Sequence, residues 1–319
     1  MHPTLLHLHL ASHDLEVSTF GVLVALGCAA AIVYGVYEGK RAGEDPAALR
    51  DLGFWVTVAS LVGARVAHVI SGGRAAWDDC LDGIADGVGP ALAACTRPLR
   101  LWEGGLVFYG GLVCGVATAL YFARRRGLDT LATLDRATPA LALGHVLGRL
   151  GCFAAGCCFG KPTVGLPGLR FPSDSIAYRE LFARGLLEPG ATHTMALHAT
   201  QLYEAAGELA LFFFLARLVR HKRYHGQVAL AYLLTYAPLR FVIELFRGDV
   251  SRGMVLAPST DWLNRWIAIP PGDPAILSTS QAAGLVIFVA AALLWARAHP
   301  RPRTATPSSS SSPPAAASR

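Results

Sequence analysis

The sequence GRLGCFAAGCCFG at residues 148–160 places one arginine and three cysteines in a short segment that follows an apolar run. A guanidinium group stays positively charged and binds phosphate oxygens through paired hydrogen bonds. A deprotonated thiol is a nucleophile and a metal ligand. We therefore expect Arg149 to bind an anionic group, with Cys152, Cys157 and Cys158 forming a thiol cluster near it.

Two other apolar segments carry polar and ionisable side chains at helical spacing. One predicted helical face holds Tyr236, Arg240, Glu244 and Arg247, at positions i, i+4, i+8 and i+11. Another holds Gln201, Glu204 and Glu208, at i, i+3 and i+7. Arginines and carboxylates on facing helices can pair with one another and then bind an anion. The structural alternative is that such pairs only fix helix register, or that Arg247 extends to lipid headgroups.

These residues belong to a chain of 319 residues that is 53% hydrophobic and 16% charged, with a mean hydropathy of +0.41. A soluble domain has about 25% charged residues, so the composition excludes an ordinary soluble protein. Seven apolar runs are long enough to cross a bilayer, at 18–37, 52–71, 105–123, 131–150, 196–219, 226–246 and 280–297. Asp135, Arg136 and Pro139 interrupt the fourth run. We predict an all-α transmembrane bundle of seven helices in one domain, residues 1–299, with a disordered cytoplasmic tail at 300–319.

Basic residues of the short loops give the predicted orientation. They follow the odd-numbered runs and are Lys40, Arg41, Arg50, Arg124, Arg125, Arg126, Arg220, Lys222, Arg223, Arg297, Arg301 and Arg303. The positive-inside rule makes that side cytoplasmic, which places the N-terminus outside and the C-terminus inside. Much of the net charge of +6 belongs to these loops beside anionic lipid, so we predict no nucleic-acid partner.

In this orientation, polar side chains of five predicted helices reach one depth near the outer leaflet. They include Arg65, Tyr109, His145, Arg149, His198, Gln201, Glu204, Tyr236, Arg240 and Glu244. An ionisable side chain at the centre of a membrane helix costs at least about 2.5 kcal/mol, so several at one level indicate a site. The small residues Gly104, Gly105, Gly110, Gly111, Gly144 and Gly148 would allow the helices to pack closely.

Five segments carry a resemblance to a known family. They are VGAR at 62–65, LWEGGLVFYGGLVCG at 101–115, GRLGCFAAGCCFG at 148–160, HATQLYE at 198–204 and LRFVIELFR at 239–247. In their order and spacing the chain resembles the prolipoprotein diacylglyceryl transferases. The resemblance implies transfer of a diacylglyceryl group from phosphatidylglycerol to the lipobox cysteine of a prolipoprotein, which leaves a thioether and glycerol phosphate. It also implies a multi-pass protein of the bacterial inner membrane, and we expect a monomer with no cofactor and no metal.

The resemblance also implies roles for the polar residues. Arg149 and Arg240 correspond to family arginines associated with the lipid phosphate and with catalysis. We expect the catalytic residues to be Arg149, Arg240, Glu244, Tyr109 and His145. Arg65 and Arg247 would join Arg149 and Arg240 in binding the lipid phosphate. The supporting residues would be Glu204, Gln201, His198 and Tyr236.

Five positions depart from the family pattern. Cys152 and Ala155 stand at asparagine positions, Cys157 at a glutamate position, Tyr109 at a histidine position and Phe20 at a tyrosine position. The arginines are kept, whereas the acid–base residues differ. The same reaction could use another base, and the candidates are His145, His198 and Tyr109. Alternatively, a paralogue could transfer from phosphatidylglycerol or another anionic lipid to a different acceptor, or could bind or transport lipid without catalysis.

The remaining inferences concern the seven cysteines. We predict a structural disulfide between Cys80 and Cys95, because both flank one outer loop in an oxidising compartment. For Cys152, Cys157 and Cys158 we expect a disulfide from Cys152 to one of the other two, with a metal site or a catalytic thiol as alternatives. The thiols also leave open a membrane thiol oxidoreductase that passes electrons to quinone.

Overall fold

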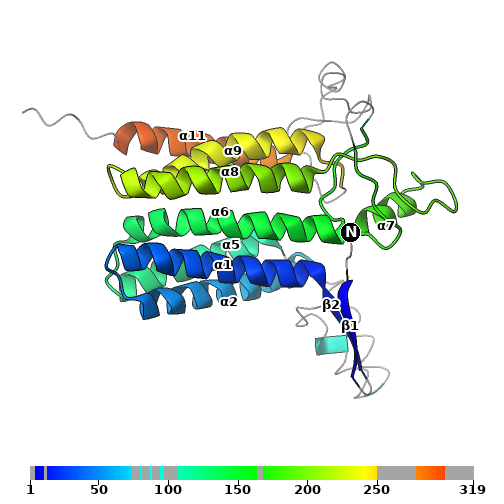
Figure 1. The fold of residues 1–319 in the computed structure, drawn as a ribbon, viewed down its shortest axis with the longest axis horizontal. Helices are drawn as coiled ribbons and strands as arrows, with labels where there is room; N and C mark the ends of the chain where they lie inside the picture. Colours follow the sequence, from blue (N-terminus) through cyan, green and yellow to red (C-terminus); the bar gives the residue numbers. More distant parts are fainter. Residues whose placement is uncertain are drawn as a thin grey trace, which may run out of the picture.

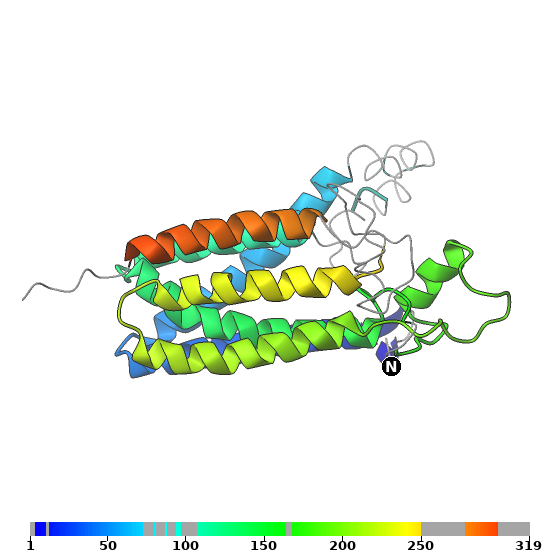
Figure 2. The ribbon, with the colours of Figure 1, turned by 90° about the horizontal axis from the view of Figure 1, so that it is seen from above.

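Seven helices of 18 or more residues dominate the part of the chain that the computed structural model describes, residues 4–10, 13–72, 80, 87, 94–96, 107–163, 168–249 and 278–298. They are α1 (Thr19–Arg41), α2 (Pro46–Ser71), α5 (Phe108–Arg125), α6 (Thr130–Ala155), α8 (Thr200–His221), α9 (Gln227–Phe246) and α11 (Thr279–Ala298). The helices lie side by side and run alternately in opposite directions (Figures 1 and 2). Each overlaps one of the seven apolar runs of the sequence.

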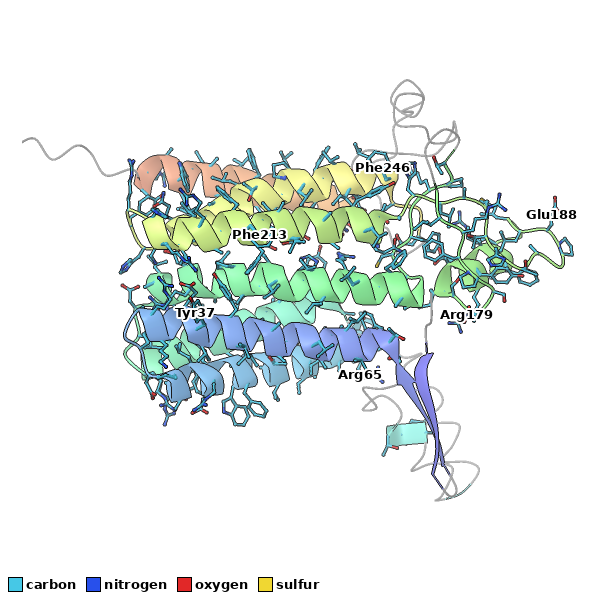
Figure 3. All side chains as sticks on the ribbon, viewed as in Figure 1. Tyr37, Arg65, Arg179, Glu188, Phe213 and Phe246 are labelled. Atoms are coloured by element: carbon cyan, nitrogen blue, oxygen red, sulfur yellow. A yellow bond between two sulfur atoms is a disulfide. The ribbon has the colours of Figure 1, made fainter. Side chains whose placement is uncertain are left out.

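Four of these helices, α1, α2, α9 and α11, are long and apolar enough to cross a membrane by length and composition. Their outward surfaces carry large apolar side chains, such as Val33, Ile70 and Val286, which are 69–73% exposed. Phe213 on α8 is also exposed, by 63% (Figure 3). Apolar side chains on the outer surface of a bundle are typical of helices that face lipid. The protein is therefore described as a membrane protein.

Small residues set how closely the helices pack, as the sequence indicated for some positions. α1 packs on α6, and a Cβ atom added to Gly27 would lie 2.9 Å from the carbonyl oxygen of Gly144. α2 packs on α5, where the Gly63 and Gly110 backbones meet. The prediction was wrong for Gly148, because a Cβ atom added there would have no neighbour within 4 Å. Gly104 and Gly105 lie outside the described residues.

The charge that interrupts the fourth apolar run has a structural role. Asp135 is fully buried near the start of α6. Its two carboxylate oxygens accept hydrogen bonds from the backbone N–H groups of Gly226, Val228 and Ala229 at the start of α9, at 2.8–3.1 Å. Lys222 also donates to Asp135, at 2.8 Å. Asp135 therefore satisfies the N–H groups that an α-helix leaves unpaired at its N-terminus.

At the end of the bundle where α1 begins and α6 ends, the chain builds a small extension. The short helix α7 (Ile176–Ala183) projects beyond the long helices there (Figure 1). A separate apolar cluster supports it: Phe159, Phe171, Ala177, Leu181 and Leu197. At the same end, β1 (Thr4–Leu10) and β2 (His13–Ser18) form an antiparallel hairpin. The fold is thus predominantly helical, and the hairpin is a feature that the all-α prediction missed.

One predicted covalent link is confirmed. The Sγ atoms of Cys80 and Cys95 are bonded in a disulfide, with Cα atoms 4.4 Å apart. The two residues lie between α2 and α5, on the side of the bundle where α2 ends and α5 begins. The predicted tail at 300–319 lies outside the described residues.

Candidate functional site

Glu204 on α8 is the point at which three helices exchange polar contacts. Its side chain is almost fully buried. Oε1 lies 2.9 Å from Nη2 of Arg149 on α6 and accepts a hydrogen bond of 3.1 Å from the Tyr236 hydroxyl on α9. Oε2 lies 3.6 Å from Nη1 of Arg240, also on α9. One buried carboxylate thus faces two arginines from different helices.

A second group of ion pairs continues along α9 from Arg240. Nη2 of Arg240 lies 2.8 Å from Oε2 of Glu244, one helical turn later. The next basic residue, Arg247, forms two hydrogen bonds to Asp249, at 2.8 and 2.6 Å. Nη1 of Arg247 also lies 3.9 Å from Glu244. The three positive charges of Arg149, Arg240 and Arg247 are therefore balanced by three carboxylates in contact with them.

His145 connects Arg149 to a further carboxylate, Glu208. The Nδ1 atom of His145 lies 2.7 Å from Oε1 of Glu208, which also accepts a hydrogen bond of 3.0 Å from Tyr232. Nε of Arg149 donates to Nε2 of His145, at 3.2 Å. Because Nε2 accepts this bond, the proton of a neutral imidazole belongs on Nδ1, facing Glu208. Both ring nitrogens are thereby engaged, and the imidazole fixes the position of the Arg149 side chain.

Some buried polar atoms of this arrangement have no hydrogen-bond partner. Among the described residues these include Nη1 of Arg240, Oε2 of Glu208 and Oε1 of Gln201. A buried donor or acceptor left unpaired costs about 1–3 kcal/mol, so such atoms are uncommon in native structures and call for an explanation. The Arg240 donor belongs to a guanidinium that already faces Glu204 and Glu244. An anionic oxygen placed near it would complete its hydrogen bonding.

Side chains from the start of α8 hold the segment that follows α6. The Thr200 hydroxyl donates to the carbonyl of Cys158, and Nε2 of Gln201 donates to the carbonyl of Cys157, both at 2.7 Å. Backbone bonds continue the connection, because Gly160 N–H donates to His198 and Lys161 N–H donates to the last residue of α9. This segment therefore joins the ends of α6, α8 and α9, the helices that carry the arginines.

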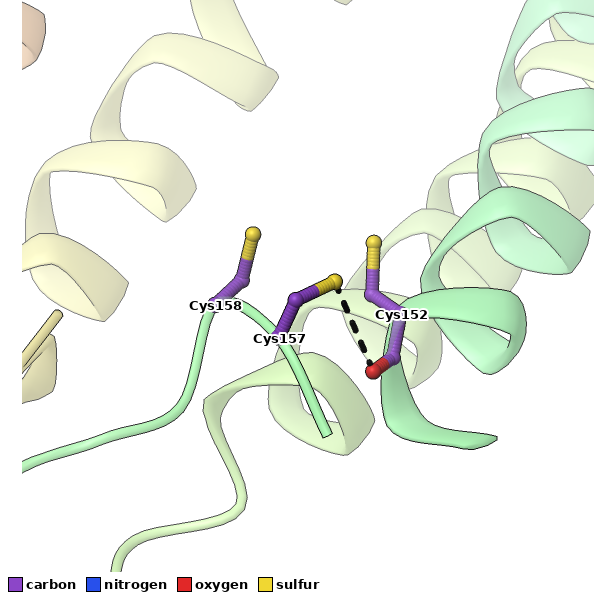
Figure 4. Close-up of side chains that lie close together, drawn as sticks. All are labelled: Cys152, Cys157 and Cys158. Carbon is purple, nitrogen blue, oxygen red and sulfur yellow. Dashed lines mark hydrogen bonds between the residues drawn. The ribbon is translucent and has the colours of Figure 1, made fainter. Parts of the chain in front are cut away.

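Three cysteines gather in this segment, and the disulfide expected among them is absent. Cys152, Cys157 and Cys158 are free thiols whose Sγ atoms all lie within 4.8 Å of one another (Figure 4). Hydrogen bonds from the Cys152 and Cys157 thiols lower the pKa of Cys158, and the charges of Arg247 and Arg149 act in the same direction. The expected disulfide from Cys152 to Cys157 or Cys158 was therefore wrong, because no bond joins these three sulfur atoms.

We call the residues of these ion pairs and hydrogen bonds the Glu204 cluster: His145, Arg149, Glu204, Glu208, Tyr232, Tyr236, Arg240, Glu244, Arg247 and Asp249. Three further residues highlighted in the sequence are Tyr109, Arg65 and His198. Tyr109 is near the start of α5, and 57% of its surface is exposed. Arg65 is buried on α2, which packs against α1 and α5, toward the end of the bundle where α1 begins (Figure 3). The ring of His198 packs on Phe246, and its Nδ1 atom contacts the Tyr203 hydroxyl at 3.3 Å.

Two residues of the cluster were not identified as site candidates from the sequence. Tyr232 lies one turn before Tyr236 on α9, and the two rings stack with centroids 5.3 Å apart. Its position at i−4 on the same helical face was an available signal. Asp249 follows Arg247 by two residues, beyond the end of α9, so helical spacing does not indicate its contact.

A bundle of long helices, several of them apolar enough to cross a membrane, with buried arginines paired to carboxylates near one end, defines a class of helical membrane protein. The comparison with known families agrees, and the chain belongs to the prolipoprotein diacylglyceryl transferase family, whose model matches residues 7–297.

Curated relatives carry the same description over most of their length. The phosphatidylglycerol–prolipoprotein diacylglyceryl transferase of Clostridium tetani is 26% identical over 275 residues, which cover 86% of this chain and 90% of the relative. The protein of that name from Stenotrophomonas maltophilia is 29% identical, over 79% of this chain and 82% of its own. The protein from Lactiplantibacillus plantarum is 30% identical, over 74% and 76%.

Proposed function

We propose that this protein transfers a diacylglyceryl group from phosphatidylglycerol to the thiol of a lipobox cysteine in a prolipoprotein. Family membership over residues 7–297 supports lipoprotein diacylglyceryl transfer. The observation that carries the proposal for this site is the position of Arg149 and Arg240, which approach the same buried carboxylate from two helices. Two guanidinium groups that face one carboxylate can also bind another anion of similar size, such as a phosphate diester.

The arginines would act on the phosphate as it leaves. In the transfer, the thiol sulfur forms a bond to the glycerol carbon, the bond from that carbon to the phosphate oxygen breaks, and the thiol proton passes to a base. Negative charge then accumulates on the departing glycerol phosphate. N–H groups of Arg149 and Arg240 that now face Glu204 would stabilise this charge, and they include Nη1 of Arg240, which has no hydrogen-bond acceptor among the residues that the structure describes. Arg247 lies one turn beyond Glu244 and would contribute further positive charge.

We assign His145 as a positioning residue. Its two ring nitrogens contact Glu208 and Arg149, so a proton can be accepted at Nε2 only if Arg149 moves away. Glu204 and Glu244 belong to the same positioning set through their ion pairs with the arginines, and Tyr236 through its hydrogen bond to Glu204. Gln201 has a supporting role, because its side chain donates a hydrogen bond to the carbonyl of Cys157 and holds the segment that follows α6.

We also propose that all seven long helices cross the bacterial inner membrane, in one domain at residues 1–299. Supporting this, the helices alternate in direction, and the basic residues Lys40, Arg125, Arg220 and Arg297 lie at one common end. By the positive-inside rule that end faces the cytoplasm, and the Glu204 cluster faces the outer leaflet. The proposed partners are phosphatidylglycerol and the prolipoprotein, with a monomer as the functional unit and no nucleic acid.

One observation favours a second candidate function, transfer from an anionic lipid to a different acceptor or lipid binding without transfer. Cys152, Ala155, Cys157 and Tyr109 stand at positions where the family pattern has other polar residues, and Tyr109 is largely exposed. Lipid binding would need the arginines and would not need these positions. The two candidate functions differ in one result: only the first attaches the diacylglyceryl group to the thiol of a lipobox peptide.

The test combines a transfer assay and a binding assay on the purified protein in detergent. The wild type, Arg149→Ala and Arg240→Ala are incubated with acyl-labelled phosphatidylglycerol and a lipobox peptide. Arg126→Ala is the control, because Arg126 is exposed and pairs with Asp51 at the opposite end of the bundle. We expect labelled peptide from the wild type and the control, and little from the other two. Arginine-dependent lipid binding without labelled peptide would favour the second candidate.

A further inference from the structure

The thiols of Cys152, Cys157 and Cys158 form a cluster that the transfer reaction does not use. Cys152 lies in the last turn of α6, and the other two follow Gly156 in the next segment. Their sulfur atoms lie within 4.8 Å of one another (Figure 4). We propose that these three residues bind one soft metal ion, of the Cu(I) class, through three thiolates.

The chain turns back so that the later thiols meet the first. Gly156 ends α6 in the left-handed conformation, with φ of 72°, which glycine adopts without strain. Its conformation lets Cys157 N–H donate to the carbonyl of Cys152, at 3.1 Å. Any other residue at Gly156 would also place its Cβ atom 2.7 Å from Cβ of Ser175. The backbone between the first and second thiols is thus fixed by a specific turn.

The third thiol is held in place at the cost of backbone strain. Cys158 is the one residue other than glycine with positive φ, 55°, among those that the structure describes. A left-handed conformation at a residue with a side chain persists only where surrounding contacts impose it, and it is concentrated at functional sites. The contacts here are the hydrogen bonds that Thr200 and Gln201 donate to the carbonyls of Cys158 and Cys157. The three sulfur atoms are therefore preorganised by groups outside the cluster.

The number and type of ligands favour Cu(I) over zinc. Thiolates are soft ligands that select Cu(I), zinc and iron–sulfur clusters. Structural zinc sites are almost always four-coordinate, and this group of His, Cys, Asp and Glu ligands in the described residues has only three members. Three sulfur atoms around one ion, with metal–sulfur bonds of about 2.3 Å, lie about 4 Å apart. The cluster reaches that spacing by a contraction of less than about 1 Å.

The surrounding charge is suited to an anionic metal–thiolate group. On binding, each of the three thiols releases its proton to solvent, and three thiolates with Cu(I) carry a net charge of −2. The guanidinium groups of Arg149 and Arg247 act electrostatically at Cys158, so positive charge lies beside the cluster. A bound ion would brace the segment that joins α6 to α8 and α9. The inference goes beyond the proposed transfer and does not depend on it.

The test measures metal binding, so it can be read apart from any transferase activity. The full-length protein in detergent is reduced, freed of reductant under nitrogen and titrated with Cu(I) in competition with a coloured Cu(I) chelator. We expect one Cu(I) per chain. Cys152→Ser, Cys157→Ser and Cys158→Ser should each weaken the affinity at least tenfold. Cys28→Ser and Cys114→Ser are matched controls, because both are free, half-buried cysteines outside the cluster, and we expect them to bind as the wild type does.

A second measurement on the wild type guards against variants that fail to fold. Alkylation followed by peptide mass spectrometry should show that Cu(I) protects Cys152, Cys157 and Cys158 and leaves the labelling of Cys28 and Cys114 unchanged. Binding of less than one Cu(I) per chain would overturn the proposal. Equal protection of the control cysteines from alkylation would also overturn it. A disulfide between two of the three cysteines would also overturn it. In protein isolated without reductant, mass spectrometry would show such a disulfide as a loss of two hydrogen atoms that a reductant reverses.

Discussion

Arg149 and Glu204, on neighbouring helices α6 and α8, form a buried ion pair with Nη2 and Oε1 2.9 Å apart. The pair links the two sides of the cluster, because Arg149 also contacts His145 and Glu204 also faces Tyr236 and Arg240. A buried pair of this kind stabilises the fold only while both charges are present. It is also the contact that a lipid phosphate would compete for.

Replacing Glu204 by glutamine should destabilise the protein. The change keeps the size of the side chain and leaves two buried guanidinium groups without their shared carboxylate. Removal of one partner of a buried pair costs about 3–5 kcal/mol, so we expect a lower midpoint of thermal unfolding in detergent. Phosphatidylglycerol should recover part of the loss, because its phosphate replaces the missing negative charge. Glu188→Gln, an exposed position, is the control, and an equal shift in both variants would contradict the assignment.

The positioning role of His145 predicts a particular pattern of kinetics. His145→Ala should lower kcat about tenfold to a hundredfold, a loss typical of a misplaced catalytic group, because Arg149 loses the acceptor that fixes its Nε. His145→Gln can still accept that hydrogen bond and should recover part of the activity. The pH profile of His145→Gln should keep the shape of the wild-type profile. Loss of one limb of the profile would instead identify His145 as the general base.

Much of this arrangement could be predicted from sequence. The seven apolar runs each overlap a long helix, and helical spacing placed Arg240 on one face with Tyr236 and Glu244. Periodicity identifies the face of a helix but not the neighbour that it meets. The buried Asp135 was therefore read only as an interruption, although it caps α9 from another helix. The free thiols likewise depend on a turn at Gly156 and on contacts from α8, which the spacing of cysteines does not specify.

The cap at Asp135 predicts a loss of stability without a specific loss of activity. Asparagine at this position removes the charge that pairs with Lys222 and replaces one acceptor oxygen by an N–H₂ group facing backbone donors. An unsatisfied buried donor costs about 1–3 kcal/mol, so we expect a lower unfolding midpoint. Activity per folded molecule should stay near the wild-type value at low temperature. A loss of activity in protein that is still fully folded would contradict this prediction. It would show that the change at Asp135 also moves the α9 residues that contact Glu204.

Close packing between α1 and α6 predicts a contrast between two glycines of the same helix. Gly27→Ala introduces a methyl group 2.9 Å from the carbonyl oxygen of Gly144, and overpacking of this kind costs typically about 1–3 kcal/mol. Gly35→Ala introduces the same group where no atom lies within 4 Å. Thermal unfolding should show a lower midpoint for Gly27→Ala and little change for Gly35→Ala. Equal midpoints would contradict the packing of these two helices.

In the proposed reaction, Arg149 and Arg240 bind the phosphate of a lipid whose diacylglyceryl group moves to a thiol. The most direct measurement uses phosphatidylglycerol with one label in the acyl chains and another in the phosphate, together with a lipobox peptide. We expect acyl label on the peptide cysteine, an equal amount of phosphate label in released glycerol phosphate, and neither product with Arg149→Ala or Arg240→Ala. An unlabelled peptide, or products formed equally well by both variants, would contradict it.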